Sequence, residues 1–131
     1  MRDTAVALYT FFSSFGIPAF IQGNVPETLY DSTTGKEIPV ELPYITYELR
    51  EPEAGKECHL MAHLWYRGSS YDAITRKADD IKDALGQGVS IPVPGGAVHL
   101  WPENPFCQFR DSGEPDVKCA YLQFSIGAYK P

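Results

Sequence analysis

The sequence has few cysteines and lacks any long hydrophobic run. Its 3 cysteines are Cys58, Cys107 and Cys119, and an odd number at wide spacing argues against a disulfide framework, so reduced core thiols are the simplest interpretation. No stretch approaches the roughly 20 consecutive apolar residues that a membrane-spanning helix needs. The first residues also lack the pattern of a secretory signal. We therefore expect a soluble protein with no membrane partner, which stays in the compartment where it is made.

Basic residues are also scarce. The chain has 11 Lys and Arg against 17 Asp and Glu, for a formal net charge of −6, and its largest basic cluster is the pair Arg76 and Lys77. Non-specific binding to nucleic acid depends on counterion release by Lys and Arg, so this composition disfavours a protein that grips nucleic acid. An acidic wall would still suit a channel through which DNA has to slide.

The composition is otherwise that of an ordinary globular protein. A length of 131 residues fits one domain, and 44% of them are hydrophobic. At this size folding hides roughly two-thirds of the surface of the unfolded chain, which is enough for one hydrophobic core. We expect residues 1–131 to form a single domain.

Two segments have the apolar spacing of amphipathic helices. Residues 4–15 carry apolar side chains at helical intervals, and Gly16 and Pro18 end that pattern. Residues 71–85 combine an apolar stripe with a charged opposite side, and Gly86 follows at the position where helices end. Both segments need a sheet or another helix to cover their apolar sides.

Alternation of apolar and polar residues predicts strands in much of the remaining chain. The predicted strands are residues 19–21, 44–50, 57–67, 89–93, 97–101 and 117–129, with a further one at 106–110. The second and third of these predict a hairpin. Two helices that cover one face of such a sheet give an α+β fold, with a mostly antiparallel, mixed sheet.

Residues 22–42 form the least regular stretch. It contains several glycines and prolines and the turn-like sequence at residues 31–35. Connections of this length are usually functional or mobile. We expect an extended loop, or a small hairpin arm built around that turn.

One side of the predicted 57–67 strand is neither ordinary core nor ordinary surface. It carries His59, His63 and Trp65, and Tyr44 joins them from the neighbouring strand. Such a mixed aromatic face is typical of a surface that meets a partner, since tyrosine and tryptophan are enriched at protein interfaces.

The same side holds the strongest candidates for chemistry. His59 and His63 are four residues apart on a strand, or about 13 Å, which is too far for one zinc ion. Cys58 and His59 are adjacent and point to opposite faces, so they do not form a nucleophile and base. We therefore expect no catalytic, cofactor-binding or metal-binding residues and no enzyme. A small α+β enzyme or ligand-binding domain is the alternative of another class, and it would use His59, His63 and Glu57 near Trp65.

A set of short motifs resembles one protein family. The bend at residues 15–19 reads Phe-Gly-Ile-Pro-Ala, residues 43–47 read Pro-Tyr-Ile-Thr-Tyr, and a strand ending in Trp65 and Tyr66 leads to a helix that opens near Ser70. In this order they resemble the small tail terminator, or tail completion, proteins of long-tailed bacteriophages and prophages. The resemblance runs over most of the chain, and residues 27–41 are longer than the usual connection in the family.

The resemblance implies a minor virion protein without catalytic residues or cofactors. Such a protein forms a homo-oligomeric ring, commonly a hexamer, on the head-proximal end of the tail-tube protein and offers a face to the head–tail connector protein. DNA passes through its channel without specific binding. The implied location is the virion tail, after assembly in the cytoplasm of a bacterial host. A head-closure or connector adaptor protein is the alternative within virion assembly.

Overall fold

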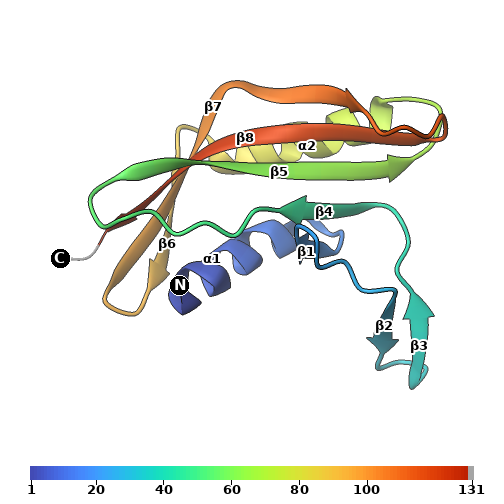
Figure 1. The fold of residues 1–131 in the computed structure, drawn as a ribbon, viewed down its shortest axis with the longest axis horizontal. Coiled ribbons are helices and arrows are strands. Elements are labelled where there is room, and N and C mark those ends of the chain that lie inside the picture. The colour runs from blue at the N-terminus through green and yellow to red at the C-terminus, as the bar shows by residue number, and fades with distance from the viewer. Residues whose placement is uncertain (130–131) are drawn as a thin grey trace.

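The computed structural model describes residues 1–129 as a six-stranded sheet, two α-helices and a separate two-stranded hairpin (Figure 1). The elements in chain order are α1 (Arg2–Phe12), the 3₁₀-helix η1 (Ser13–Phe15), β1 (Ala19–Ile21), β2 (Thr28–Asp31), β3 (Lys36–Pro39), β4 (Tyr44–Tyr47), β5 (Glu57–Arg67), α2 (Asp72–Leu85), β6 (Val89–Val93), β7 (Gly96–Asp111) and β8 (Val117–Tyr129).

The sheet has the strand order β1-β4-β5-β8-β7-β6. β1 pairs with β4 in parallel, and every other pair in this sheet is antiparallel. The central pair, β5 and β8, stays in register from Glu57 opposite Gly127 to Arg67 opposite Val117. The prediction of an α+β fold with a mostly antiparallel, mixed sheet is confirmed.

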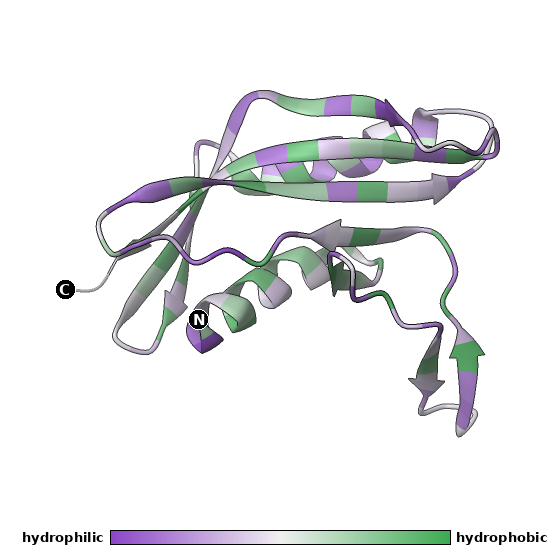
Figure 2. Ribbon diagram, viewed as in Figure 1, coloured by the Kyte–Doolittle hydropathy of each residue, from purple (hydrophilic) through white to green (hydrophobic). Residues whose placement is uncertain are grey.

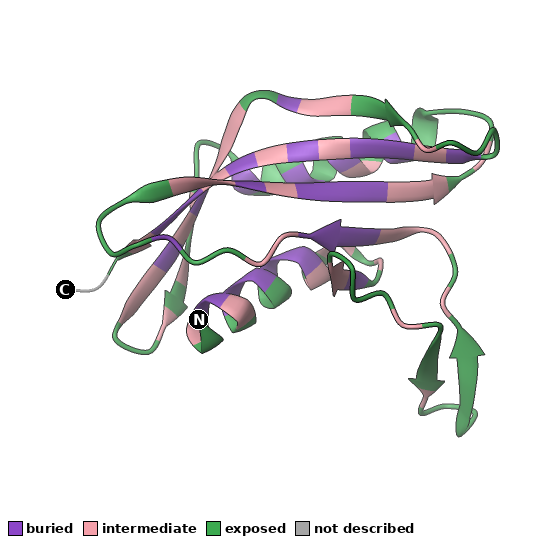
Figure 3. Ribbon diagram, in the orientation of Figure 1, coloured by how far each residue is buried: buried purple, intermediate pink, exposed green. Residues whose placement is uncertain are grey.

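Both helices pack on the same face of this sheet. Alternate residues of β5 and β8, such as Leu60, Leu64 and Phe124, are fully buried, and they form one cluster with the apolar sides of α1 and α2. Phe12 of α1 meets Phe124 edge-on at 5.4 Å and stacks on Tyr47 of β4 at 4.7 Å. Burying one such side chain contributes about 1.5–3 kcal/mol. Figures 2 and 3 show the resulting stripes, in which the apolar residues of the central strands are also the buried ones.

The helix bounds differ slightly from the sequence pattern. α1 begins at Arg2 and ends at Phe12, and η1 completes the segment to Phe15, where the pattern predicted one helix over residues 4–15. Gly16 adopts φ 82°, a left-handed conformation that ends helices and that residues with a Cβ rarely take. In the described residues neither helix has the length and apolar character needed to cross a membrane.

Two strands differ from their predicted lengths. β4 covers residues 44–47 instead of 44–50, because the Glu48 carboxylate replaces a backbone partner and accepts a hydrogen bond from Met61 N at 2.8 Å. β7 is one long strand where two were predicted. Its pairing with β8 shifts between Pro102 and Cys107, since the prolines there lack the N–H that a ladder needs, but the chain stays extended.

The irregular stretch forms a hairpin arm, which is one of the two predicted forms. We call residues 22–42 the arm; it contains β2 and β3, which pair antiparallel (Figure 1). Its turn is held by Asp31, whose carboxylate accepts hydrogen bonds from Thr33 N at 2.9 Å and Thr34 Oγ1 at 3.1 Å. These bonds, the Thr33 amide first, hold the pKa of the Asp31 carboxyl below its usual value. Most of the arm is exposed (Figure 3).

Candidate protein-interaction face

The side of the sheet that points away from the helices is here called the open face. The alternation of each strand places its residues there, and the strand register sets them side by side. Its main members are Tyr44, Thr46 and Glu48 next to or on β4, His59, Met61, His63 and Trp65 on β5, Tyr121, Gln123 and Ser125 on β8, and Glu103, Gln108 and Arg110 on β7. Most of these side chains are partly exposed, whereas Thr46 and His63 are buried.

One half of the open face is organised around Trp65. Its indole N–H donates to Thr46 Oγ1 at 3.0 Å, and the His63 ring stacks on it with the ring centres 5.8 Å apart. The guanidinium of Arg110 lies 3.3 Å from His63 Nε2. Burial lowers the pKa of His63, the charge on Arg110 lowers it further, and Glu48 opposes both. His63 is therefore a neutral acceptor near pH 7.

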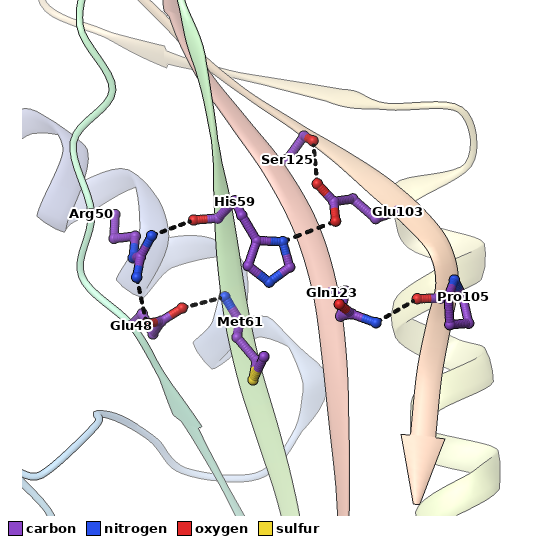
Figure 4. Close-up of polar contacts among 8 residues, drawn as sticks. All are labelled: Glu48, Arg50, His59, Met61, Glu103, Pro105, Gln123 and Ser125. Atoms are coloured by element: carbon purple, nitrogen blue, oxygen red, sulfur yellow. Dashed lines mark hydrogen bonds and ion pairs between the residues drawn. The ribbon is translucent and has the colours of Figure 1, made fainter.

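The other half is held together by carboxylates (Figure 4). His59 Nδ1 lies 2.9 Å from one Glu103 oxygen, and Ser125 Oγ donates to the other at 2.8 Å, so one side chain links β5, β7 and β8. Glu48 in turn forms an ion pair with Arg50 at 3.2 Å, and Arg50 Nη1 donates to the backbone oxygen of His59 at 3.2 Å. The polar atoms of the face therefore bind one another across the strands.

The polar side chains of the open face are already hydrogen-bonded to one another. Within residues 1–129, every buried side-chain nitrogen and oxygen has a hydrogen-bond partner. Tyr121 donates to Gln108, and Gln123 donates to the Pro105 carbonyl at 3.0 Å. Fully satisfied networks of this kind rigidify a surface. The arrangement suits a pre-organised contact surface better than a reactive site.

The predicted candidates for chemistry are not brought together. His59 and His63 share the open face, as the alternation predicted, but His59 pairs with Glu103 and His63 with Arg110. Glu57 lies at the start of β5, opposite Gly127. Across the described part of the chain, no group of three or more His, Cys, Asp or Glu residues is arranged to hold a metal ion.

The thiols of Cys107 and Cys119 are held in their protonated form. Burial raises the pKa of Cys119 to about 11, with a small opposing effect of Arg110. The pKa of Cys107 is raised as well, by burial first and by Asp79 second. A protonated, buried thiol is a poor nucleophile. Together with Cys58 these are free cysteines; Cys119 is buried, whereas Cys58 and Cys107 are partly buried and pack against the core.

Two partners in the network were not found from the sequence. Glu103 follows Pro102 in what looked like a break between strands, and Arg110 stood at the end of a short additional strand. Their positions opposite β8 can be assigned only when residues 96–111 are treated as one strand. The local signal was masked by the two prolines.

A hollow of about 640 Å³ lies where the arm joins the open face. Leu42 and Tyr44 line it from the arm side, and Trp65, Arg67 and Val117 line it from the sheet. The hollow joins the arm and the open face into one continuous surface. Comparison of the sequence with protein-family models and with curated proteins gave no match.

Proposed function

We propose that this chain is a structural virion protein of the tail terminator type. Copies of it form a ring on the head-proximal end of a phage tail tube and join the tube to the head–tail connector. The observation that carries this proposal is the asymmetry of the sheet: two helices shield one face, while no element of the described chain covers the open face or the arm. These free surfaces are what a ring subunit needs for its neighbours.

The motifs that resemble the tail terminator family support the proposal. The bend at residues 15–19 leads into β1, residues 43–47 contain β4, and Trp65 and Tyr66 end β5 just before α2. Of these motif residues, Tyr44 and Trp65 line the hollow beside the arm. The described elements also follow the order that the resemblance implies.

The character of the open face favours protein contact over catalysis. It presents tyrosine, tryptophan and histidine rings between hydrogen-bonded polar groups, and such aromatic residues are enriched at interfaces. Its ionisable side chains are paired with one another, as Glu103 is with His59. A face of this kind can dock a neighbour without reorganising.

The charge of the chain suits a passage for DNA. A net charge of −6 gives no overall attraction for phosphate, so DNA can move through a ring without being bound in one register. Under this proposal the protein assembles in the cytoplasm of a bacterial host and ends in the virion tail.

The experiment is assembly with tail tubes. Purified chain is sized by light scattering, alone and with the cognate tail-tube protein, and the mixture is imaged by negative-stain electron microscopy. We expect rings at one end of the tubes and shorter tubes as the chain is added in excess. A protein that stays monomeric beside tubes of unchanged length would refute the proposal.

The same preparation tests the adaptor alternative. A head-closure or connector adaptor would bind isolated connector rings but leave tube length unchanged. Binding to both connector and tube ends is expected of a terminator.

A further inference from the structure

The arm exposes an apolar side. Leu29 of β2 and Ile38 of β3 are directly opposite each other in the hairpin, and they are 36% and 45% exposed. Tyr30, on the other side of the hairpin, is 69% exposed. A two-stranded hairpin is marginally stable in water unless another surface covers it. The arm therefore needs an apolar partner.

The arm is also acidic. Residues 22–42 contain four carboxylates, Glu27, Asp31, Glu37 and Glu41, and one cation, Lys36. A surface that receives the arm should combine exposed apolar groups with a positive charge.

A second exposed cluster has these properties, and we call it the Tyr71–Phe109 patch. The rings of Tyr71, just before α2, and Phe109, on β7, have centres 4.4 Å apart and are 39% and 51% exposed as residues. The Lys118 ammonium lies 5.3 Å from the centre of the Tyr71 ring. The charged residues that line the hollow beside Tyr71 are the cations Arg110 and Lys118 and the carboxylates Asp111 and Glu114. The patch also borders an open strand edge, since β6 pairs only with residues 96–100 of β7 and the described chain places no strand beyond residues 106–111.

The arm and the patch lie toward opposite edges of the sheet. The arm connects β1 to β4, which form one edge, whereas Phe109 lies in the half of β7 that forms the other edge. Figure 1 shows the arm leaving the β4 side and pointing away from β7 and α2. The arm therefore points away from the patch of its own chain and is free to reach the patch of another copy.

The third exposed apolar cluster does not fit as well. Val6 and Tyr9 on the outer side of α1 are 60% and 56% exposed. α1 contacts β1, at the edge from which the arm leaves, and also β6, at the other end of the strand order. Val6 and Tyr9 lack the closely packed aromatic pair with an adjacent ammonium that Tyr71, Phe109 and Lys118 provide.

We propose that the arm of one copy docks on the Tyr71–Phe109 patch of the next copy, in a head-to-tail contact. This inference rests on the ring proposed above and names its subunit contact. Leu29 and Ile38 cover the two aromatic rings, and Lys118 lies near the carboxylates of the arm. Such a heterologous contact closes into a ring when the rotation between copies allows it.

The test uses two variants, each lacking one half of the contact. Ile38→Glu places a charge on the arm, and Phe109→Glu places one in the patch. Each should weaken self-association by at least about tenfold, because a charge would be buried without a partner. Mixed in equal amounts, the two variants should form a dimer that grows no further, since one intact arm still meets one intact patch. Mass photometry and sedimentation velocity read out the species, with cognate tail tubes present if the ring closes only on them.

Val6→Glu is the matched control, because it adds the same charge at an exposed apolar residue of α1 and should leave assembly unchanged. Circular dichroism and thermal melting check that each variant folds, and Tyr71→Asp replaces Phe109→Glu if the latter does not. Rings formed by all the variants would overturn the arm contact while leaving the ring standing. Wild-type protein that never assembles would overturn the ring proposal itself and the contact that rests on it.

Discussion

The two faces of the β5–β8 pair are built from alternate residues of the same strands, yet they are stabilised in different ways. On the helix side, Leu60, Leu122 and Phe124 are fully buried among apolar side chains. On the open face, neighbouring residues such as His59 and Ser125 bind the Glu103 carboxylate and remain partly exposed. One face is held by exclusion of water and the other by directed polar contacts.

The difference explains how one sheet can fold and still offer a surface. Apolar burial is worth most per residue, so the helix side carries most of the stability of the fold. Net hydrogen-bond contributions are smaller, at about 0.5–1.5 kcal/mol each, and serve mainly to fix side chains in place. We therefore expect changes on the helix side to unfold the protein and changes on the open face to alter its surface.

The largest effect is expected from Phe124→Ala. This ring meets Phe12 and Phe106 edge-on at 5.4 and 5.3 Å, so its removal leaves a cavity in the core. The loss in the free energy of unfolding should be about 3–5 kcal/mol in urea titration. The control is Gln123→Ala at the adjacent residue, whose side chain lies on the open face. This variant loses the hydrogen bond to the Pro105 carbonyl. Equal losses for the two variants would contradict the division between the faces.

A smaller effect is expected from Trp65→Phe on the open face. Phenylalanine keeps an aromatic ring near His63 but cannot donate to Thr46 Oγ1, and Thr46 is only 6% exposed. We expect a loss of about 1–2 kcal/mol. Thr46→Val and the double variant complete a mutant cycle, and additive losses would show that the indole and the hydroxyl are not coupled.

The helix side could be predicted from the sequence because its signal is local. Burial selects apolar residues at every second position of a strand, so the alternation in residues 117–129 placed Leu122, Phe124 and Ile126 correctly without knowledge of any partner. The hairpin arm followed from local turn residues at 31–35 for the same reason.

The polar contacts of the open face could not be predicted in this way. His59 and Glu103 are 44 residues apart, and they meet only because β8 lies between their strands in one particular register. Residues 102–105 include two prolines, which favoured a break where the structure keeps one strand. Likewise, nothing local to Phe109 showed that it would meet Tyr71 at the start of α2.

The pH dependence of stability tests how firmly the open face excludes water at His63. Burial and Arg110 lower the pKa of His63 below its unfolded value, so the unfolded chain binds the proton more readily. Its contribution to stability is therefore complete above the unfolded pKa of about 6.5 and is lost as the pH falls toward the folded pKa. His63→Gln should lose less stability between about pH 7 and 5 than the wild type, as measured by urea titration at each pH. If stability falls with pH equally in the two proteins, water reaches His63 in the folded state.

The smallest effect is expected from Glu103→Gln, which removes the charge but keeps an oxygen for Ser125. His59 and Glu103 are 36% and 34% exposed, so solvent competes for their contact, and its loss should cost only about 0.2–1 kcal/mol. A smaller cost in high salt, where exposed charges are screened, would show that the His59 ring carries a charge in this contact. Glu53→Gln, which breaks the more exposed pair with Lys56, gives the baseline. A loss above about 2 kcal/mol for Glu103→Gln would exceed what an exposed pair contributes and would show that the Glu103 bridge holds the strands of the open face in register.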